Sequence, residues 1–215
     1  MATGYHIDFP MLNSIINYKS EENQIDLYKQ MFSPKLKQPH TLCFIGLVNP
    51  NASIYPIFEQ QARWFVELIN GNCKLPSKNV MFKDIKRVQQ LRKSQFYESP
   101  RHTFEIDWID YMDNLAEQFG AKPKLLKYIF TDPKLAWKIN FRTALSYHYR
   151  LEGPHSWVGA REAILNADQR IAFGINHSRS KITSEIVKKN CNFFSIFCSI
   201  ITIVIFGSAL NYFYK

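Results

Sequence analysis

The sequence has few of the residues that build disulfide frameworks and metal sites. It contains four cysteines, Cys43, Cys73, Cys191 and Cys198, and no two of them form a C-x-x-C pair. Its six histidines are dispersed, and none stands in an H-E-x-x-H pattern. These spacings argue against a disulfide framework and against a zinc site. We therefore expect a protein of a reducing compartment that holds no metal.

Glycine-rich phosphate-binding loops are lacking as well. The chain contains 8 glycines, which form neither the G-x-G-x-x-G turn that binds dinucleotides nor a Walker-A loop. The segment Gly153–Gly159 places Ser156 between two glycines, but a nucleophile elbow needs a glycine two residues to either side of its serine. The residues alone thus indicate no catalytic nucleophile and no acid–base pair.

Basic residues exceed acidic ones, giving a net charge of +9, yet no arginine-rich run appears. Lys and Arg are interleaved with Asp and Glu through most of the chain. The combination of basic and aromatic residues typical of RNA-binding sheets is also missing. We therefore expect no nucleic-acid binding, and we interpret the basic face from Lys83 to Lys93 as a solvated helix surface.

The apolar run Thr41–Val48 is bounded by Pro39 and by a polar turn, Asn49–Ser53, which predicts a buried strand that ends in a turn. From Pro56 onward the apolar residues recur at helical spacing, which predicts a helix to about Asn70, where Gly71 follows. In α/β sheets, ligands bind beyond the carboxyl ends of strands. The turn is therefore a candidate ligand contact, with an ordinary strand–helix connection as the alternative.

The remaining apolar patterns are mostly helical, so we expect an α/β fragment with many helices and a few short strands. A helix is predicted after Ser77 with Val80, Met81, Ile85, Val88 and Leu91 on its apolar face; others are predicted over Asp107–Phe119, over Leu125–Phe130, from Thr131–Pro133 onward, and over Trp157–Ile171. The segment Ser146–Leu151 alternates and is predicted to be extended.

The C-terminal end is apolar. No charged residue occurs from Phe193 to Tyr214, and about 20 apolar residues suffice to cross a bilayer core. We expect a transmembrane helix over residues 192–214, preceded by a basic linker over residues 176–191. The basic flank places the soluble part in the cytosol, where the sequons at Asn51 and Asn176 stay unmodified.

Several sequence blocks resemble the C-terminal half of the flavin-containing monooxygenases, in that family's order. Ala2-Thr3-Gly4-Tyr5 is similar to the end of the family's F-A-T-G-Y motif. The other blocks are Phe44–Leu47, Gln61–Trp64, Asp132–Ala136, Tyr149–Leu151, Gly153-Pro154, Trp157, Gly159–Arg161 and Ala163-Ile164. The chain departs from the family pattern at Asn49, usually Gln, at Asn51-Ala52, usually Leu-Gly, and at His155, usually Gly.

The resemblance implies a fold and an activity. The family binds FAD and NADPH through two glycine-rich dinucleotide motifs, and a peroxide adduct of its reduced flavin oxygenates soft nitrogen or sulfur centres of small molecules. We accordingly expect residues 1–175 to be the C-terminal part of a flavoprotein with two dinucleotide-binding domains, anchored in the endoplasmic reticulum membrane. Residues expected near the cofactors are Ala2, Thr3, Gly4, Tyr5, Asn49 and Pro50, with no catalytic side chain.

Both dinucleotide motifs would precede Met1, so we expect the chain to be the back part of a longer protein and to be inactive alone. A hypothesis from another class remains open. The chain could instead be a non-catalytic, tail-anchored helical adaptor, whose basic face from Lys83 to Lys93 meets an acidic partner.

Overall fold

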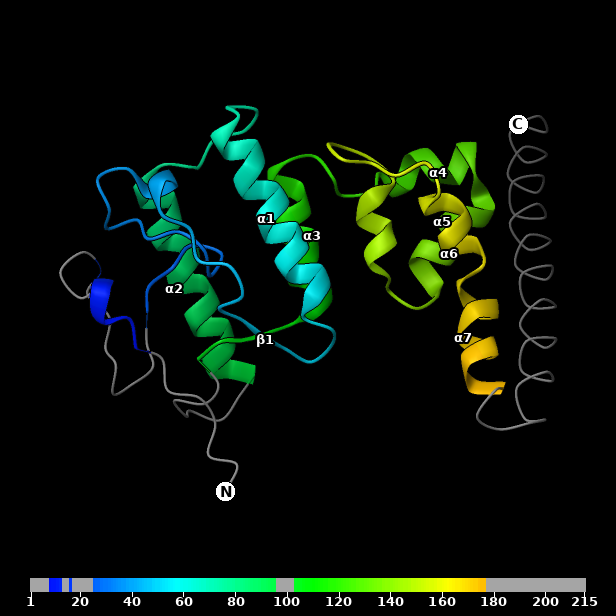
Figure 1. Cartoon of the computed structure of the whole chain (residues 1–215), viewed down its shortest axis with the longest axis horizontal. Coiled ribbons are helices and arrows are strands. Elements are labelled where there is room, and N and C mark those ends of the chain that lie inside the picture. The colour runs from blue at the N-terminus through cyan, green and yellow to red at the C-terminus, as the bar shows by residue number, and fades with distance from the viewer. Residues whose placement is uncertain (1–7, 13–15, 17–24, 96–102, 177–215) are drawn as a thin grey trace, which may run out of the picture. The chain divides into compact units, whose positions relative to one another are not determined.

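Helices make up most of the described residues in the computed structural model of the chain (Figure 1). The structure describes residues 8–12, 16, 25–95 and 103–176. The helices are α1 (Tyr55–Ile69), α2 (Lys78–Gln95), α3 (Trp108–Gln118), α4 (Leu125–Thr131), α5 (Pro133–Phe141), α6 (Ala160–Leu165) and α7 (Ala167–Asn176), with 3-10 helices at Pro10–Leu12, Pro39–Thr41 and Ser146–Arg150. One unit extends to Ile164, and a second begins at Leu165.

Helix α1 forms where the sequence predicts a helix. Pro56 lies in its first turn, where a missing N–H is tolerated. Its buried apolar face includes Ile57 and Trp64, both fully buried. The helix ends at Ile69, and Gly71 follows with a φ of +75°, the left-handed conformation that glycine adopts without strain. This confirms the predicted helix and both of its boundaries.

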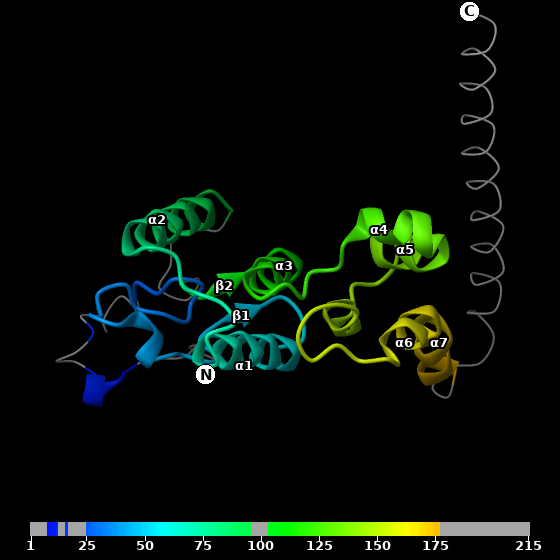
Figure 2. The same cartoon turned by 90° about the horizontal axis from the view of Figure 1, so that it is seen from above.

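Helix α3 packs against α1 (Figure 2). Asp107 caps its start, because the Asp107 carboxylate accepts a hydrogen bond from the Asp110 backbone N–H at 3.0 Å. Met112 and Leu115 of α3 lie in the main core together with Trp64 and Phe32, whose rings meet edge to face at 5.0 Å. The predicted helix over Asp107–Phe119 is thereby confirmed.

Helix α2 contributes less to the core than its sequence pattern indicates. It follows Ser77 as predicted, and Met81 and Ile85 are buried. Val80 and Leu91, expected on the same apolar face, are exposed. The helix therefore packs through a narrow stripe.

Helices α4 and α5 also match the prediction. Asp132 lies between them and caps α5, since its side chain accepts a hydrogen bond from the Leu135 backbone N–H at 3.1 Å. The same carboxylate pairs with Arg161 at 2.5 Å, which connects the start of α5 to α6. Hydrogen bonding to Arg161 holds the pKa of the Asp132 carboxyl below its ordinary value.

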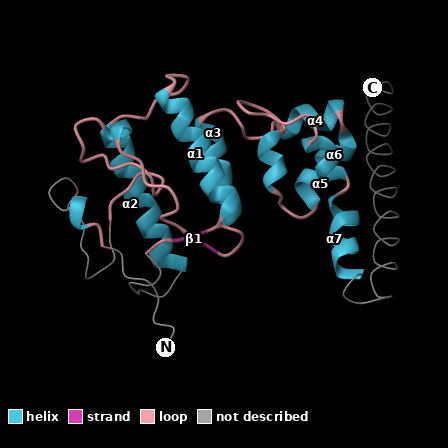
Figure 3. Ribbon diagram, viewed as in Figure 1, coloured by secondary structure: helices cyan, strands magenta, loops and turns pink. Residues whose placement is uncertain are grey.

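The strand predicted over Thr41–Val48 is wrong. A short strand, β1, forms at Asn49–Pro50 (magenta in Figure 3). It pairs in parallel with β2 at Glu105–Ile106. An extended run needs a neighbouring strand for its backbone groups, and here those groups find other partners. The Phe44 N–H donates to the Met31 carbonyl at 2.9 Å, and Gly46, with a φ of +90°, donates to a side chain.

Two other predictions also need correction. Ser146–Leu151, predicted to be extended, contains a 3-10 helix over Ser146–Arg150, closed by bonds such as His148 N–H to the Leu145 carbonyl at 3.1 Å. The helix predicted over Trp157–Ile171 begins at Ala160 and is interrupted at Asn166. Asn favours the position before a helix, and the Asn166 carbonyl accepts from the Arg170 N–H of α7.

No helix within the described ranges is long and apolar enough to cross a membrane. The predicted span over residues 192–214 and the linker from 177 onward lie outside the described residues.

Gly153 and Gly71 provide a matched pair for a stability test. Both have a φ near +75°, but a Cβ atom on Gly153 would lie 2.6 Å from the Gly120 carbonyl oxygen, whereas one on Gly71 would meet nothing within 4 Å. We expect Gly71→Ala to lower the free energy of unfolding by about 1 kcal/mol through backbone strain. Gly153→Ala adds overpacking and should cost about 3 kcal/mol or more. Urea unfolding of both variants measures the difference, and equal losses would contradict the close packing of Gly153.

Candidate functional site

The carboxyl ends of β1 and β2 meet at one edge. The register pairs Asn49 with Glu105 and Pro50 with Ile106. Strand β1 then leads through an exposed turn into α1, and β2 leads through Asp107 into α3. This is the arrangement beside which α/β proteins bind ligands. The turn predicted as a ligand contact therefore lies at the carboxyl edge of a parallel pair, although the pair is only two residues long.

Asn49 and Pro50, the predicted site residues, have no free backbone donor at this edge. The Asn49 N–H donates to the Phe104 carbonyl at 2.7 Å, and Pro50 has no N–H. The Asn49 side-chain amide donates to the Glu105 carboxylate at 2.7 Å. Glu105 could not be identified from the sequence, because only the strand register brings it next to Asn49. The other predicted residues, 2–5, lie outside the described residues, so their role stays a prediction.

The turn is also held from the side of α3. The Trp108 indole N–H donates to the Ser53 carbonyl at 2.8 Å, and the Trp108 ring is buried. Trp108 is the first residue of α3, so this bond fixes the distance between the starts of α1 and α3. A helix over Asp107–Phe119 was predicted from the sequence, but this contact of Trp108 follows only from the fold.

A chain of hydrogen bonds supports the segment before the turn. The Gly46 N–H donates to the Gln61 side-chain carbonyl at 2.8 Å, and the Gln61 amide donates to the Tyr111 hydroxyl at 2.8 Å. Tyr111 in turn donates to the Lys29 carbonyl at 2.5 Å. Gln61 is fully buried, so each polar group is satisfied where water cannot reach it. Burial also raises the pKa of the Tyr111 hydroxyl, which remains protonated as a donor.

Arg63 connects α1 to the 3-10 helix Ser146–Arg150 and to the segment that follows it. Its guanidinium donates to the Tyr149 carbonyl at 3.0 Å and to the Pro154 carbonyl at 2.7 Å, and it lies over the Phe119 ring. Burial lowers the Arg63 pKa to about 10, an effect strengthened by Arg150, so the group stays charged at neutral pH. A charged donor on two carbonyls is a strong attachment for this loop.

His155 shows how the chain accommodates one of its departures from the family pattern. Its φ of +59° lies in the left-handed region, where glycine carries no steric cost. Its imidazole lies 3.3 Å from the buried Glu67 carboxylate, which also accepts a hydrogen bond from Asn72 at 2.7 Å. The histidine thus gains a side-chain partner at a position where its backbone conformation is unfavourable.

The backbone N–H groups of Gly46 and Asn49 are not free to hold a phosphate. A pyrophosphate is usually held by free N–H groups of a glycine turn at a helix start. Here the N–H groups of Gly46 and Asn49 are already bonded, and α1 begins with a proline in its first turn. No cluster of His, Cys, Asp and Glu that could hold a metal ion occurs in the described ranges. What this part of the chain offers is a rigid edge rather than a phosphate cradle.

Comparison with known proteins identifies a family. The model of the flavin-binding monooxygenase-like family matches residues 1–212. Dimethylaniline monooxygenase (N-oxide-forming) 2 of Rattus norvegicus is 46% identical over 170 residues, which cover 79% of this chain and 31% of the rat protein. Flavin-containing monooxygenase 5 of Cavia porcellus is 40% identical over 211 residues, covering 98% of this chain and 38% of the relative. The chain therefore spans about a third of the length of these relatives.

Among solved structures, the S-allyl-L-cysteine S-oxygenase of Allium sativum is similar, with a TM-score of 0.48 and 26% sequence identity. The match covers 75% of this chain and 36% of that structure.

The hydrogen-bond chain through Gln61 generates a stability prediction. Gln61→Leu leaves the Gly46 N–H without a partner and removes the bond that the Tyr111 hydroxyl accepts, although Tyr111 still donates to the Lys29 carbonyl; it should cost about 2–3 kcal/mol. Tyr111→Phe should cost about 1–3 kcal/mol, and the double variant should lose less than the sum by about 1 kcal/mol, because the bonds are shared.

Urea unfolding gives the energies. Gln90→Leu, at an exposed position of α2, is the matched control and should change stability by less than about 0.5 kcal/mol. Strict additivity of the two buried substitutions would show that Gln61 and Tyr111 are not coupled.

Proposed function

Because the chain belongs to the flavin-binding monooxygenase-like family, we propose that it forms the C-terminal portion of an FAD- and NADPH-dependent monooxygenase. The substrate class we propose is a small molecule with a soft nucleophilic nitrogen or sulfur. The observation that carries this proposal is the match over residues 1–212, together with 46% identity to a relative named for N-oxide formation. The adaptor hypothesis is not favoured, since the whole match is to an enzyme family.

FAD and NADPH would supply the redox chemistry, and this chain would help to position the cofactors. We propose that Asn49 and Pro50 line the flavin crevice from the carboxyl edge of β1, with residues 2–5 near the dinucleotides. The fixed distance between the starts of α1 and α3, set by Trp108 and the Ser53 carbonyl, supports such a role. A cofactor site needs this rigidity because small displacements weaken catalysis.

We further propose that the isolated chain binds neither cofactor tightly and is inactive. Its sequence contains no G-x-G-x-x-G turn, and the edge described above has no free phosphate-binding N–H groups at Gly46 or Asn49.

A chimera tests the proposal. In the rat relative, the matched C-terminal segment is replaced by this chain. We expect the chimera to retain flavin and to convert dimethylaniline to its N-oxide with NADPH and oxygen, while the purified chain alone should be colourless. Asn49→Ala in the chimera should lower kcat/KM about tenfold through lost positioning at the cofactor edge. Asn79→Ala, at an exposed position of α2, should leave it unchanged.

The chimera tests the proposed activity, and the isolated chain tests the proposed lack of cofactor binding. A chimera that holds stoichiometric flavin but forms no N-oxide would contradict the proposed activity. A yellow isolated chain that keeps flavin through gel filtration would contradict the claim that it cannot bind the cofactor alone.

We also propose that the three sequence segments are functional divisions, with residues 1–175 as the C-terminal part of the FAD- and NADPH-binding fold, 176–191 as a basic linker and 192–214 as a membrane anchor of the endoplasmic reticulum. The carbonate-resistant attachment expected of the whole chain should be lost when it is truncated after Cys191, leaving only salt-sensitive binding through basic residues. Protease protection should show residues 1–175 in the cytosol. Extraction of the intact chain by carbonate, or glycosylation at Asn51, would refute the anchor or its direction.

A further inference from the structure

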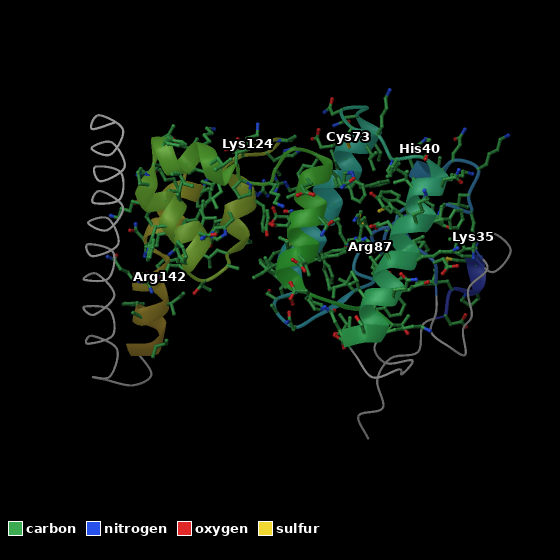
Figure 4. All side chains as sticks on the ribbon, turned by 180° about the vertical axis from the view of Figure 1, so that it is seen from behind. Lys35, His40, Cys73, Arg87, Lys124 and Arg142 are labelled. Carbon is green, nitrogen blue, oxygen red and sulfur yellow. The ribbon has the colours of Figure 1, made fainter. Side chains whose placement is uncertain are left out.

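A small cleft lies between α2 and α3, beside the carboxyl end of β2. Its volume is about 180 Å³, and its walls also include residues 25–30 and β2. Figure 4 labels Arg87 on α2, the helix that forms one wall. Aliphatic side chains that line the cleft are Ile25, Leu27, Ile85, Val88 and Ile106. A space of this size is below the about 300 Å³ of common drug-sized pockets, so only a small molecule fits it.

Arg92 is the unusual residue of this cleft. Its Nε atom is buried and has no hydrogen-bond partner. Burial lowers the pKa of the guanidinium, and no neighbouring carboxylate offsets this effect. A buried charge is ordinarily paired with an opposite charge, because its desolvation is otherwise uncompensated. Arg92 therefore lacks a counter-ion from the part of the chain that the structure describes.

The other cations of the cleft are already paired. Lys29 Nζ lies 3.2 Å from one Asp84 carboxylate oxygen, and Arg87 donates to the other at 2.8 Å. Lys29 also donates to the Asn114 side-chain carbonyl at 3.3 Å. Asp84 is thus engaged on both oxygens and does not serve as the partner of Arg92.

The wall opposite α2 is held in a costly conformation. Lys29 and Gln30 are consecutive non-glycine residues with φ values of 50° and 56°. Such left-handed residues each cost about 1 kcal/mol or more and persist where the surroundings fix them. Here the Tyr111 hydroxyl donates to the Lys29 carbonyl, and Gln30 is buried. The backbone that forms this side of the cleft is therefore held in one conformation.

We propose that this cleft binds a small free carboxylic acid with a short aliphatic chain, whose carboxylate pairs with Arg92. The planar guanidinium matches a carboxylate in geometry and charge, and the aliphatic walls match the chain. Glu105, Asp107 and Asp110 also line the cleft, and their negative charge opposes a multiply charged anion such as phosphate more strongly than a single carboxylate. The cleft shares Glu105 with the proposed cofactor edge, but its test does not depend on monooxygenase activity.

The test uses the whole 215-residue chain in a non-ionic detergent, with hexanoate as the probe in isothermal titration calorimetry. We expect hexanoate to bind with a Kd of about 1 mM or tighter, and hexan-1-ol and phosphate to bind at least about tenfold more weakly. Arg92→Gln should weaken hexanoate binding about tenfold or more. Lys86→Gln removes the same charge from an exposed position of α2 outside the cleft, and should change the Kd less than about twofold.

A second measurement needs no variant. Phenylglyoxal modifies arginine, and hexanoate should slow modification of Arg92 but not of Arg142, which lies outside the cleft. Failure of hexanoate to bind at about 20 mM, equal affinity for Arg92→Gln, or equal protection of both arginines would overturn the proposal. The side-chain carboxylate of N-acetyl-glutamate α-amide serves as a peptide mimic. Binding tighter than that of hexanoate would show that the site takes a protein carboxylate, which would overturn the assignment to a free acid.

Discussion

Helix α1 is joined to its surroundings by buried polar side chains on the same face that carries Ile57 and Trp64. The Gln60 amide donates to the Met112 carbonyl at 2.9 Å, Gln61 bridges Gly46 and Tyr111, and Arg63 binds two carbonyls of a distant loop. Hydrogen bonds are directional, whereas apolar contacts tolerate sliding. A shift of α1 along its axis would break all of these bonds together. The position of α1 is therefore fixed in rotation and in translation. The turn at the start of α1, which is part of the candidate site, is fixed with it.

This polar face also accounts for the Gln61–Trp64 block that resembles the monooxygenase family. Three of its side chains are buried, and Gln61 and Arg63 each satisfy groups from other segments of the chain. Removing either side chain would leave buried donors or acceptors with neither water nor a protein group to bond. The loss in folding free energy would then exceed the net contribution of a single hydrogen bond. The block is explained by the assembly of the fold around the site rather than by direct chemistry on a substrate.

The sequence predicted the elements whose signals are local. The helices α1, α3 and α5 have a proline or an aspartate at their starts, and α1 and α3 have a glycine after their ends, so their boundaries could be read from neighbouring residues. The strand over Thr41–Val48 and the extended segment over Ser146–Leu151 were wrong, because strands depend on partners far away in sequence. Asn49 was predicted in a turn but is the first residue of β1, and its contact with Glu105 follows only from the register of β1 with β2.

Many of the bonds that position the candidate site end on backbone atoms. Trp108 binds the Ser53 carbonyl, Tyr111 binds the Lys29 carbonyl, and Gln61 accepts the Gly46 N–H. A bond to the main chain does not depend on which side chain that residue carries. The turn after β1 can therefore exchange its side chains over evolutionary time while its path through space is retained, as at Asn51-Ala52. Substitutions in this turn can therefore change which ligand groups it contacts without changing the position of its backbone.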